Sequence, residues 1–249
     1  MITPPVLITS SVITMDASGM LNNPDLRIQY TLESIAAWLK IKPETQLVIC
    51  DGSGYDFTPS IQAHFPSAQF ECLTFINNRD KVKKHGKGYG EGEIIRYALT
   101  HSRFLQGADV FMKCTAKLWI SNVDECMKQW NGQFACNAYF AHVFSLKKTK
   151  LQFIDTRFYI STKAFYLHYF SEAHMDVGDE AGRSIEDAFL EVIRQHRIEH
   201  ILFRIPPIVC GVGGGSGKYY KSGRLRIFKD RLRAQIAQKN TAYTELFIK

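Results

Sequence analysis

An alternation of short apolar runs with segments of helical periodicity constrains the fold of this chain most strongly. The run at 6–13 is rich in β-branched residues, and the apolar residues of 26–39 recur near every 3.6 positions. Apolar runs at 46–50 and 69–75 then precede a second periodic segment at 90–105. Because parallel strands need crossover connections that pack on the faces of the sheet, this order predicts a mostly parallel, three-layer α/β sheet.

The next apolar run, 110–112, leads into Lys113, Thr115 and Lys117. In open α/β folds ligands bind at the carboxyl ends of the strands, so polar residues after such a run are site candidates. Two lysines at one strand end predict a site for an anion.

The second half of the chain is less regular. Its patterns predict helices at 122–130 and 184–196 and strands at 134–145, 151–161 and 201–209. Ser184 is a suitable N-cap for its helix, and Asp187 stands at the third position of the first turn. The last strand is interrupted by Pro206 and Pro207.

The length of 249 residues suits one α/β domain with a short extension, which we place at 1–217 and 218–249. The net charge of +7 is concentrated at 218–233. This segment contains seven basic residues and one acidic residue, and apolar residues alternate with the basic ones. Such a basic amphipathic helix suits an anionic membrane surface, an acidic partner or nucleic acid. A solvated helix whose apolar side packs on the domain is the alternative.

Localisation is expected to be cytoplasmic, peripheral at the inner face of the membrane if the basic helix binds lipid. No window approaches the roughly 18 apolar residues of a membrane span. The first residues lack the charged and apolar regions of a signal peptide. Six scattered cysteines without a C-x-x-C pair indicate reduced thiols and neither a disulfide framework nor a zinc site.

Two glycine-rich segments are candidates for binding phosphate. The segment 213–218 is not a Walker A motif, because Val212 and Tyr219 stand where glycine and Ser or Thr are required. It is either a loop that delivers Lys218 to a phosphate or a linker. The segment 85–92 is expected to be a loop between a strand and a helix, where glycines admit a ligand or only connect the two.

Two pairs of charged residues carry further candidate chemistry. Glu186 and Asp187 lie in the first turn of a helix, where acids either stabilise the helix dipole or act as a general base toward a hydroxyl. Asp155 and Arg157 share one face of a strand, and hold a polar ligand or form a structural ion pair.

Taken in order, these segments resemble the nucleotide-sugar-dependent glycosyltransferases of the GT-A fold. The run at 7–11 is similar to the strand that receives the nucleotide base, and 47–53 is similar to the next strand, whose final Asp commonly faces the base. The segments 88–91 and 108–112 are similar to the glycine–helix–strand run before the family's metal motif. The helix start at 184–189 is similar to the one that supplies the base of inverting members.

The resemblance implies a GT-A-like (Rossmann-like) sheet flanked by helices, with a basic C-terminal helical extension. It also implies the substrates: a nucleotide-sugar donor and a saccharide or glycolipid acceptor. The expected donor-binding residues are Thr9, Ser10, Ser11, Arg27, Asp51, Ser53, Gly88, Gly90 and Glu91. Glu186 or Asp187 is the expected catalytic base, and Asp155 and Arg157 are expected to orient the sugar or acceptor.

One departure from the family concerns the metal. Where the family has Asp-x-Asp for a divalent cation, this chain has Lys113-Cys-Thr115. A cation there offsets the charge of the leaving group. Lys113, Thr115, Lys117 and Lys218 are expected to take over that role, so no metal ligand is assigned and no cofactor is required. A cation such as Mn²⁺ or Mg²⁺ at Asp155 is the alternative.

The residues around Lys113 and Asp155 also resemble a branch of bacterial surface-polysaccharide transferases, of the lipopolysaccharide-core or capsule type. This predicts sugar transfer in cell-surface polysaccharide synthesis, with inversion expected and retention left open. The alternatives are a nucleic-acid-binding protein that uses the basic helix and a sugar nucleotidyltransferase. No recognised nucleic-acid-binding module supports the first, and the missing Asp-x-Asp counts against the second.

Overall fold

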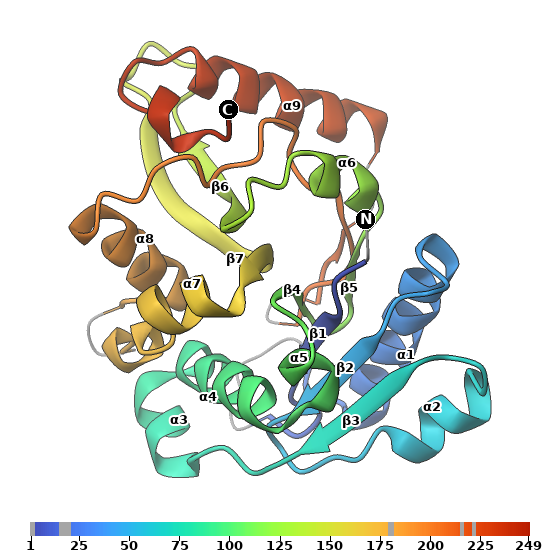
Figure 1. The fold of residues 1–249 in the computed structure, drawn as a ribbon. Coiled ribbons are helices and arrows are strands. Elements are labelled where there is room, and N and C mark those ends of the chain that lie inside the picture. The colour runs from blue at the N-terminus through green and yellow to red at the C-terminus, as the bar shows by residue number, and fades with distance from the viewer. Residues whose placement is uncertain (1–2, 15–20, 179–181, 215–216, 221–222) are drawn as a thin grey trace.

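The structure is a computed structural model that describes residues 3–14, 21–178, 182–214, 217–220 and 223–249. A six-stranded sheet of order β3-β2-β1-β4-β7-β6 forms its centre (Figure 1). The strands are β1 (Val6–Ser10), β2 (Leu47–Asp51), β3 (Phe70–Thr74), β4 (Val110–Thr115), β6 (Phe134–Ala141) and β7 (Lys150–Thr162). The first four strands in this order, β3 to β4, pair in parallel, and β7 and β6 join them antiparallel. The predicted mostly parallel α/β sheet is confirmed.

A second sheet extends the C-terminal end of β4. It has the order β5-β8-β9 and consists of β5 (Leu118–Ile120), β8 (Val209–Val212) and β9 (Tyr219–Tyr220). The prediction of a strand over 201–209 is wrong, because only Val209 lies in β8 and Leu202 makes isolated bridges. The two prolines, Pro206 and Pro207, cannot donate to a ladder, which explains why the strand starts after them.

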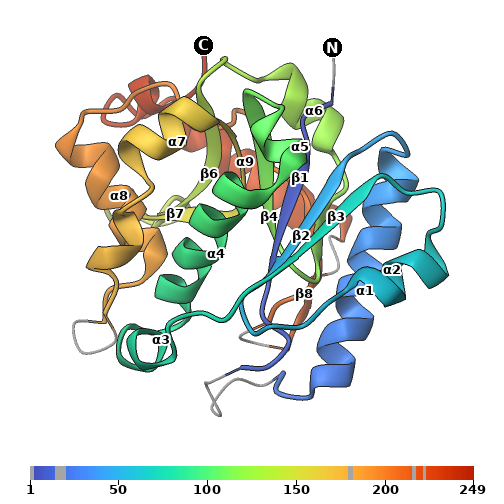
Figure 2. The same ribbon diagram turned by 60° about the horizontal axis from the view of Figure 1, so that its bottom comes forward.

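Helices cover both faces of the main sheet, with α1 and α2 on one face and α4 and α5 on the other (Figure 2). The helices are α1 (Pro24–Ile41), α2 (Thr58–His64), α3 (Arg79–His85), α4 (Lys87–His101), α5 (Arg103–Gln106), α6 (Val123–Lys128), α7 (Lys163–Tyr169), α8 (Ile185–Gln195) and α9 (Arg224–Gln238), with short 3-10 helices η1 (Ala173–Asp176) and η2 (Thr244–Leu246). On the α1 face, Ile35 and Trp38 pack on the sheet in one apolar core. Within the described ranges, no helix is both long and apolar enough to cross a membrane.

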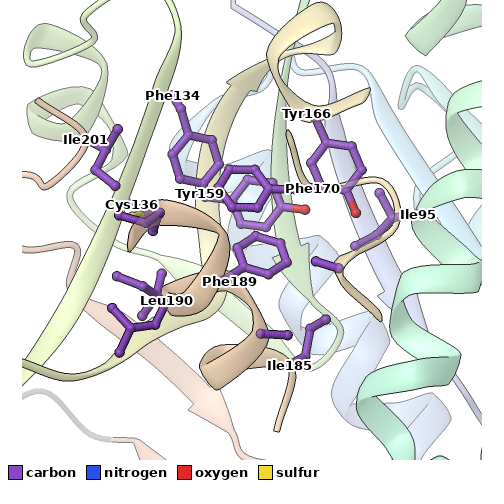
Figure 3. Close-up of a cluster of buried hydrophobic side chains, with 14 of the residues drawn as sticks. Ile95, Phe134, Cys136, Tyr159, Tyr166, Phe170, Ile185, Phe189, Leu190 and Ile201 are labelled. Carbon is purple, nitrogen blue, oxygen red and sulfur yellow. The ribbon is translucent and has the colours of Figure 1, made fainter. Parts of the chain in front are cut away.

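The opposite core contains an aromatic cluster that fixes α8 on the sheet (Figure 3). Phe170 and Phe189 stack with their ring centroids 4.3 Å apart, and Tyr159 of β7 lies 6.0 Å from Phe189. Aromatic pairs of this kind contribute about 0.5–1.5 kcal/mol beyond the area they bury. The N-terminus of α8, where Glu186 and Asp187 stand, is therefore held in a fixed place beside the sheet.

The glycine-rich segment 85–92 is not the loop that its composition predicts. Gly86, at φ 83°, ends α3, and Gly88, Gly90 and Gly92 lie inside α4. A Cβ on each would approach a neighbouring side chain: Ile185 at 3.0 Å for Gly88, Asn77 at 2.6 Å for Gly90 and His174 at 2.2 Å for Gly92. These glycines let the start of α4 pack closely, and that contact outweighs their poor helix propensity.

The C-terminal segment 218–249 contains the predicted basic helix, now bounded as α9. Ala234 and Ala237 are its buried residues, and Phe247 and Ile248 each enter one of the two cores. Leu225 and Phe228, two of the apolar residues that alternate with the basic ones, are 79% and 63% exposed. The segment thus packs on the main domain through two alanines of α9 and through Phe247 and Ile248, and the boundary at 217/218 stays a prediction.

Candidate functional site

Lys113 lies within β4 and not after it, because the strand continues to Thr115. Its ammonium is fully buried and donates to Glu91 Oε1 (2.5 Å), Thr115 Oγ1 (2.9 Å) and the Thr156 carbonyl (2.7 Å). Glu91 Oε1 also accepts from Thr9 Oγ1 at 3.0 Å and Thr115 Oγ1 at 3.2 Å. All three protons of the ammonium are therefore used inside the protein, and Lys113 neutralises Glu91 of α4.

This network lowers the pKa of Glu91. Burial raises the pKa, but the Lys113 ammonium and the hydrogen bonds to the carboxylate outweigh burial. A lowered pKa means that the carboxylate form contributes stability above the unfolded pKa near 4.5, and that this contribution is lost as the pH falls below it.

We predict that Glu91→Gln destabilises the fold by about 3 kcal/mol, because it leaves the Lys113 ammonium buried without a counter-charge. Urea unfolding at pH 7 measures the effect. The control is Glu172→Gln, which breaks the exposed Arg96–Glu172 pair (2.9 Å) and should cost less than about 1 kcal/mol. Equal losses in the two variants would contradict the assignment of Glu91 and Lys113 as a buried pair.

Lys117 stands in the tight turn between β4 and β5. Its φ of 71° lies in the left-handed region, which costs a non-glycine residue about 1–2 kcal/mol. Its carbonyl accepts from Val212 N at 3.0 Å, and Gly211, at φ 105°, allows the approach because a Cβ there would lie 2.0 Å from the same carbonyl. The side chain of Lys117, which this turn holds in place, is only 3% exposed.

Arg27 of α1 lies beside Lys117. Its guanidinium donates to the carbonyls of Ser11 (2.7 Å) and Leu21 (2.9 Å), and the residue is 8% exposed. A Cβ placed on Gly214 would lie 3.5 Å from Lys117 Nζ and 3.9 Å from Arg27 Nη1. Both cationic groups therefore border the same point of the glycine segment after β8.

No described carboxylate forms an ion pair with Arg27 or Lys117. Asp51 acts on both charges, but its oxygens accept from Val12 N (2.9 Å), Ser53 N (2.8 Å) and Ser53 Oγ (2.5 Å). Burial and the Arg27 charge lower the pKa of Lys117 to about 7, and burial lowers the pKa of Arg27. Among the described residues, Arg27 and Lys117 are therefore two buried cations without an ion-pair partner, an arrangement that favours an anionic ligand.

The two carboxylates at the start of α8 have different roles. Asp187 completes a capping box, in which Oδ2 accepts from Ser184 N (3.0 Å) and Ser184 Oγ (2.7 Å). Burial raises the pKa of Glu186, and the Glu91 and Lys113 charges act on it. The predicted N-cap at Ser184 is confirmed, and Glu186 has the environment of a general base or acid.

Asp155 and Arg157 form a bidentate ion pair, with Nε to Oδ1 at 2.8 Å and Nη2 to Oδ2 at 2.5 Å. The guanidinium lies 5.3 Å from the ring centroid of Tyr220, and Asp155 raises the pKa of Arg157 against the effect of burial. A metal at Asp155 would have to break this pair.

The residues at the strand ends therefore do not fit a divalent cation. Lys113 is neutralised by Glu91, and the cationic groups without an ion-pair partner among the described residues there are Arg27 and Lys117. One group of possible ligands lies within the described residues, Glu199, His200 and Glu245, close to the C-terminus. It contains none of the predicted site residues.

The remaining predicted residues organise the loops at these strand ends. Thr9 and Ser10 end β1 and are buried, and Ser11 positions Arg27 through its carbonyl. Asp51 and Ser53 join the loops after β1 and β2. Gly88 and Gly90 have the packing role described above, and the Lys218 carbonyl accepts from Gly213 N at 2.9 Å. Their roles toward a donor stay predictions.

Asn77 is a candidate that the sequence pattern did not reveal, because it stands in a polar stretch without a motif. Its backbone N donates to Gly52 O at 2.9 Å and its Nδ2 to Gly90 O at 3.3 Å. Its buried Oδ1 has no hydrogen-bond partner among the described residues. Buried polar atoms normally have partners, so this oxygen is an acceptor for a ligand or a water molecule.

No family model matches this chain, and no curated protein matches its sequence. Solved structures do match. The inositol-1-phosphate CTP transferase from T. maritima has a TM-score of 0.52 at 10% identity, with 95% of this chain and 96% of that chain covered. A putative nucleotide-diphospho-sugar transferase from Desulfovibrio desulfuricans G20 gives a TM-score of 0.49 at 12% identity, with 80% and 78% covered.

The galactosyltransferase LgtC, solved with donor and acceptor sugar analogs, gives a TM-score of 0.49 at 4% identity, with 76% and 70% covered. At these identities the likeness shows the fold alone. The chain has the GT-A-like fold of nucleotide-dependent transferases, as its sequence resemblance implied. The names of these structures include a galactosyltransferase and a CTP transferase.

Proposed function

We propose that this chain is a glycosyltransferase that moves a sugar from a nucleotide-activated donor to a hydroxyl of a saccharide or lipid-linked saccharide. The observation that carries the proposal is the pair of buried cations formed by Arg27 of α1, which contacts Ser11 after β1, and Lys117 after β4. A diphosphate supplies the counter-charge that this pair lacks. Positive groups aimed at a departing diphosphate stabilise the charge that develops as the sugar leaves.

The base of this reaction is Glu186, because Asp187 is engaged in the helix cap. Its raised pKa suits a group that accepts a proton from the attacking hydroxyl near neutral pH. Lys113 and Glu91 form a buried ion pair beneath the site, and the charges of both act on Glu186. Attack from the face opposite the diphosphate inverts the anomeric centre. The Arg157–Asp155 pair orients the sugar or the acceptor.

A pH dependence follows from Lys117. Its pKa is near 7 in the free protein, and a bound diphosphate favours the charged form and raises it. Binding therefore takes up a proton, and the dissociation constant of a nucleoside diphosphate should rise by about tenfold per unit between about pH 7.5 and 9. Isothermal titration in buffers of different ionisation enthalpy measures the proton uptake. A dissociation constant that stays flat over this range would contradict the Lys117 assignment.

The reaction itself is tested with UDP-, GDP-, dTDP- and CMP-sugars in EDTA, with saccharide acceptors present. We expect one donor to release its nucleotide with transfer of the sugar, without added metal. The parallel reaction contains nucleoside triphosphates, sugar phosphates and Mg²⁺. Release of pyrophosphate there, with no transfer from any nucleotide sugar, would identify a nucleotidyltransferase and contradict the proposal.

A role in cell-surface polysaccharide or lipopolysaccharide synthesis belongs to the same proposal, with the enzyme bound peripherally at the inner face of the membrane. The support is α9, which exposes Phe228 on a helix of high positive charge. Co-sedimentation with phosphatidylglycerol vesicles tests it. Binding that persists in Phe228→Ser at high salt would contradict a role of this helix.

A further inference from the structure

A groove with a volume of about 590 Å³ lies between β6, β7, the segment 206–209 and α9. Arg157 lines this groove, and the next residue, Phe158, is opposite Cys114 near the end of β4 in the β4–β7 register. The groove therefore adjoins the strand end at which the proposed reaction takes place. The sequence patterns did not indicate it, because its lining comes from segments that lie far apart along the chain.

One wall of the groove is aromatic. Tyr139 of β6 and Phe153 of β7 stack with centroids 5.3 Å apart and planes 13° apart, and Tyr139 is 39% exposed. Arg233 of α9 lies 5.2 Å from the centroid of the Tyr139 ring. Aromatic rings beside polar groups provide flat apolar surface for the C–H face of a sugar ring together with hydrogen bonds for its hydroxyls.

The lining of the groove is mostly basic in its charged residues. Five basic side chains line the groove against two acidic ones: Arg157, Arg226, Lys229, Arg231 and Arg233 against Asp155 and Asp230. Asp155 is taken up by Arg157, and Asp230 lies 2.7 Å from Arg233 and 3.9 Å from Arg226. Lys229 forms no ion pair with any described residue. The positive side chains of the groove therefore outnumber the acidic side chains that pair with them.

The groove also has groups that bind neutral hydroxyls. Asn137 is opposite Asp155 in the β6–β7 register, and both line the groove. Carboxylate oxygens accept from sugar hydroxyls, which a DNA backbone does not offer. The combination of an aromatic ledge, hydroxyl-binding groups and unpaired positive charge fits a saccharide with an acidic group better than it fits a nucleic acid.

We propose that this groove binds the acceptor, and that the acceptor is an anionic saccharide that carries a phosphate or a uronate. This rests on the proposed glycosyltransferase function and adds the class of its second substrate. The sugar ring contacts the exposed side of the Tyr139–Phe153 pair, its hydroxyls contact Asn137 and Asp155, and its acidic group pairs with Lys229 and Arg226.

Isothermal titration of the full chain with two matched pairs of probes tests the proposal. Trigalacturonate is compared with its methyl ester, and maltotriose carrying a 6-phosphate with maltotriose, so that the pairs separate a uronate from a phosphate. At least one acidic probe should bind about tenfold more tightly than its neutral partner. In Arg226→Gln/Lys229→Gln this preference should disappear. The control Arg224→Gln/Lys239→Gln removes the same charge from exposed positions outside the groove and should keep it.

Equal affinity for acidic and neutral probes, no binding of any probe, or equal loss in the control would overturn the proposal. Tighter binding of a ten-residue oligothymidylate than of either acidic probe would do the same. A melting scan of each variant verifies folding.

Titration with nucleoside diphosphates separates this inference from the proposed function. If a nucleoside diphosphate binds and the saccharides fail, only the groove inference is wrong, whereas the absence of nucleotide binding contradicts the function.

Discussion

Lys117→Asn should lower kcat/KM for the nucleotide sugar by about 10²–10³-fold, the range expected when one preorganised group that stabilises developing charge is removed. Asparagine tolerates the left-handed backbone of this turn, where φ is 71°, so the change removes the charge and keeps the turn. Steady-state kinetics measure the effect, with whichever nucleotide sugar proves to be the donor in the screen.

The fold should not lose stability in this variant. The pKa of Lys117 is about 7 in the folded chain against 10.5 in the unfolded chain, so the unfolded state binds more protons between these values. The lysine is therefore destabilising at neutral pH, and its removal should leave the melting temperature equal or higher. Lys128→Asn, at an exposed position in the last turn of α6, is the control and should keep full activity. Normal activity in Lys117→Asn would remove Lys117 from the site.

Glu186→Gln should lower kcat by about 10²–10⁴-fold, the usual contribution of a general base, with little change in nucleotide affinity. Glutamine keeps the size of the side chain and removes its ability to accept a proton. The matched variant is Asp187→Asn, one residue away. It should lose about 1 kcal/mol of stability through the helix cap and keep its activity within a few-fold. Full transfer activity in both variants would exclude the start of α8 as the source of the base.

Much of the fold follows from local patterns in the chain. The strands β1 and β2 are apolar runs buried on both sides, and Ser184 with Asp187 forms the capping box that their spacing predicts. The glycines of α4 were misinterpreted because their reason is tertiary. Gly92 is required by His174, which is 82 positions away, and no local pattern carries that contact.

The candidate site is harder to predict for the same reason. Lys113 and Lys117 look alike in the sequence, as two cations beside one strand end. The structure separates them, because Glu91 neutralises Lys113 whereas Lys117 meets another cation, Arg27. These neighbours lie 22 positions apart (Glu91 and Lys113) and 90 positions apart (Arg27 and Lys117), so the local periodicity of the sequence does not reveal them. Asn77 has no motif at all, and only its unpartnered oxygen identifies it.

The central claim is that Arg27 and Lys117 hold a nucleotide diphosphate in place of a metal ion. Isothermal titration of UDP, GDP and dTDP into the wild-type chain and Lys117→Asn, with EDTA in both, tests it most directly. We predict that at least one nucleotide binds the wild type in EDTA and that its affinity falls by about tenfold or more in the variant. Binding that requires Mn²⁺, or that is equal in the two proteins, would contradict the account.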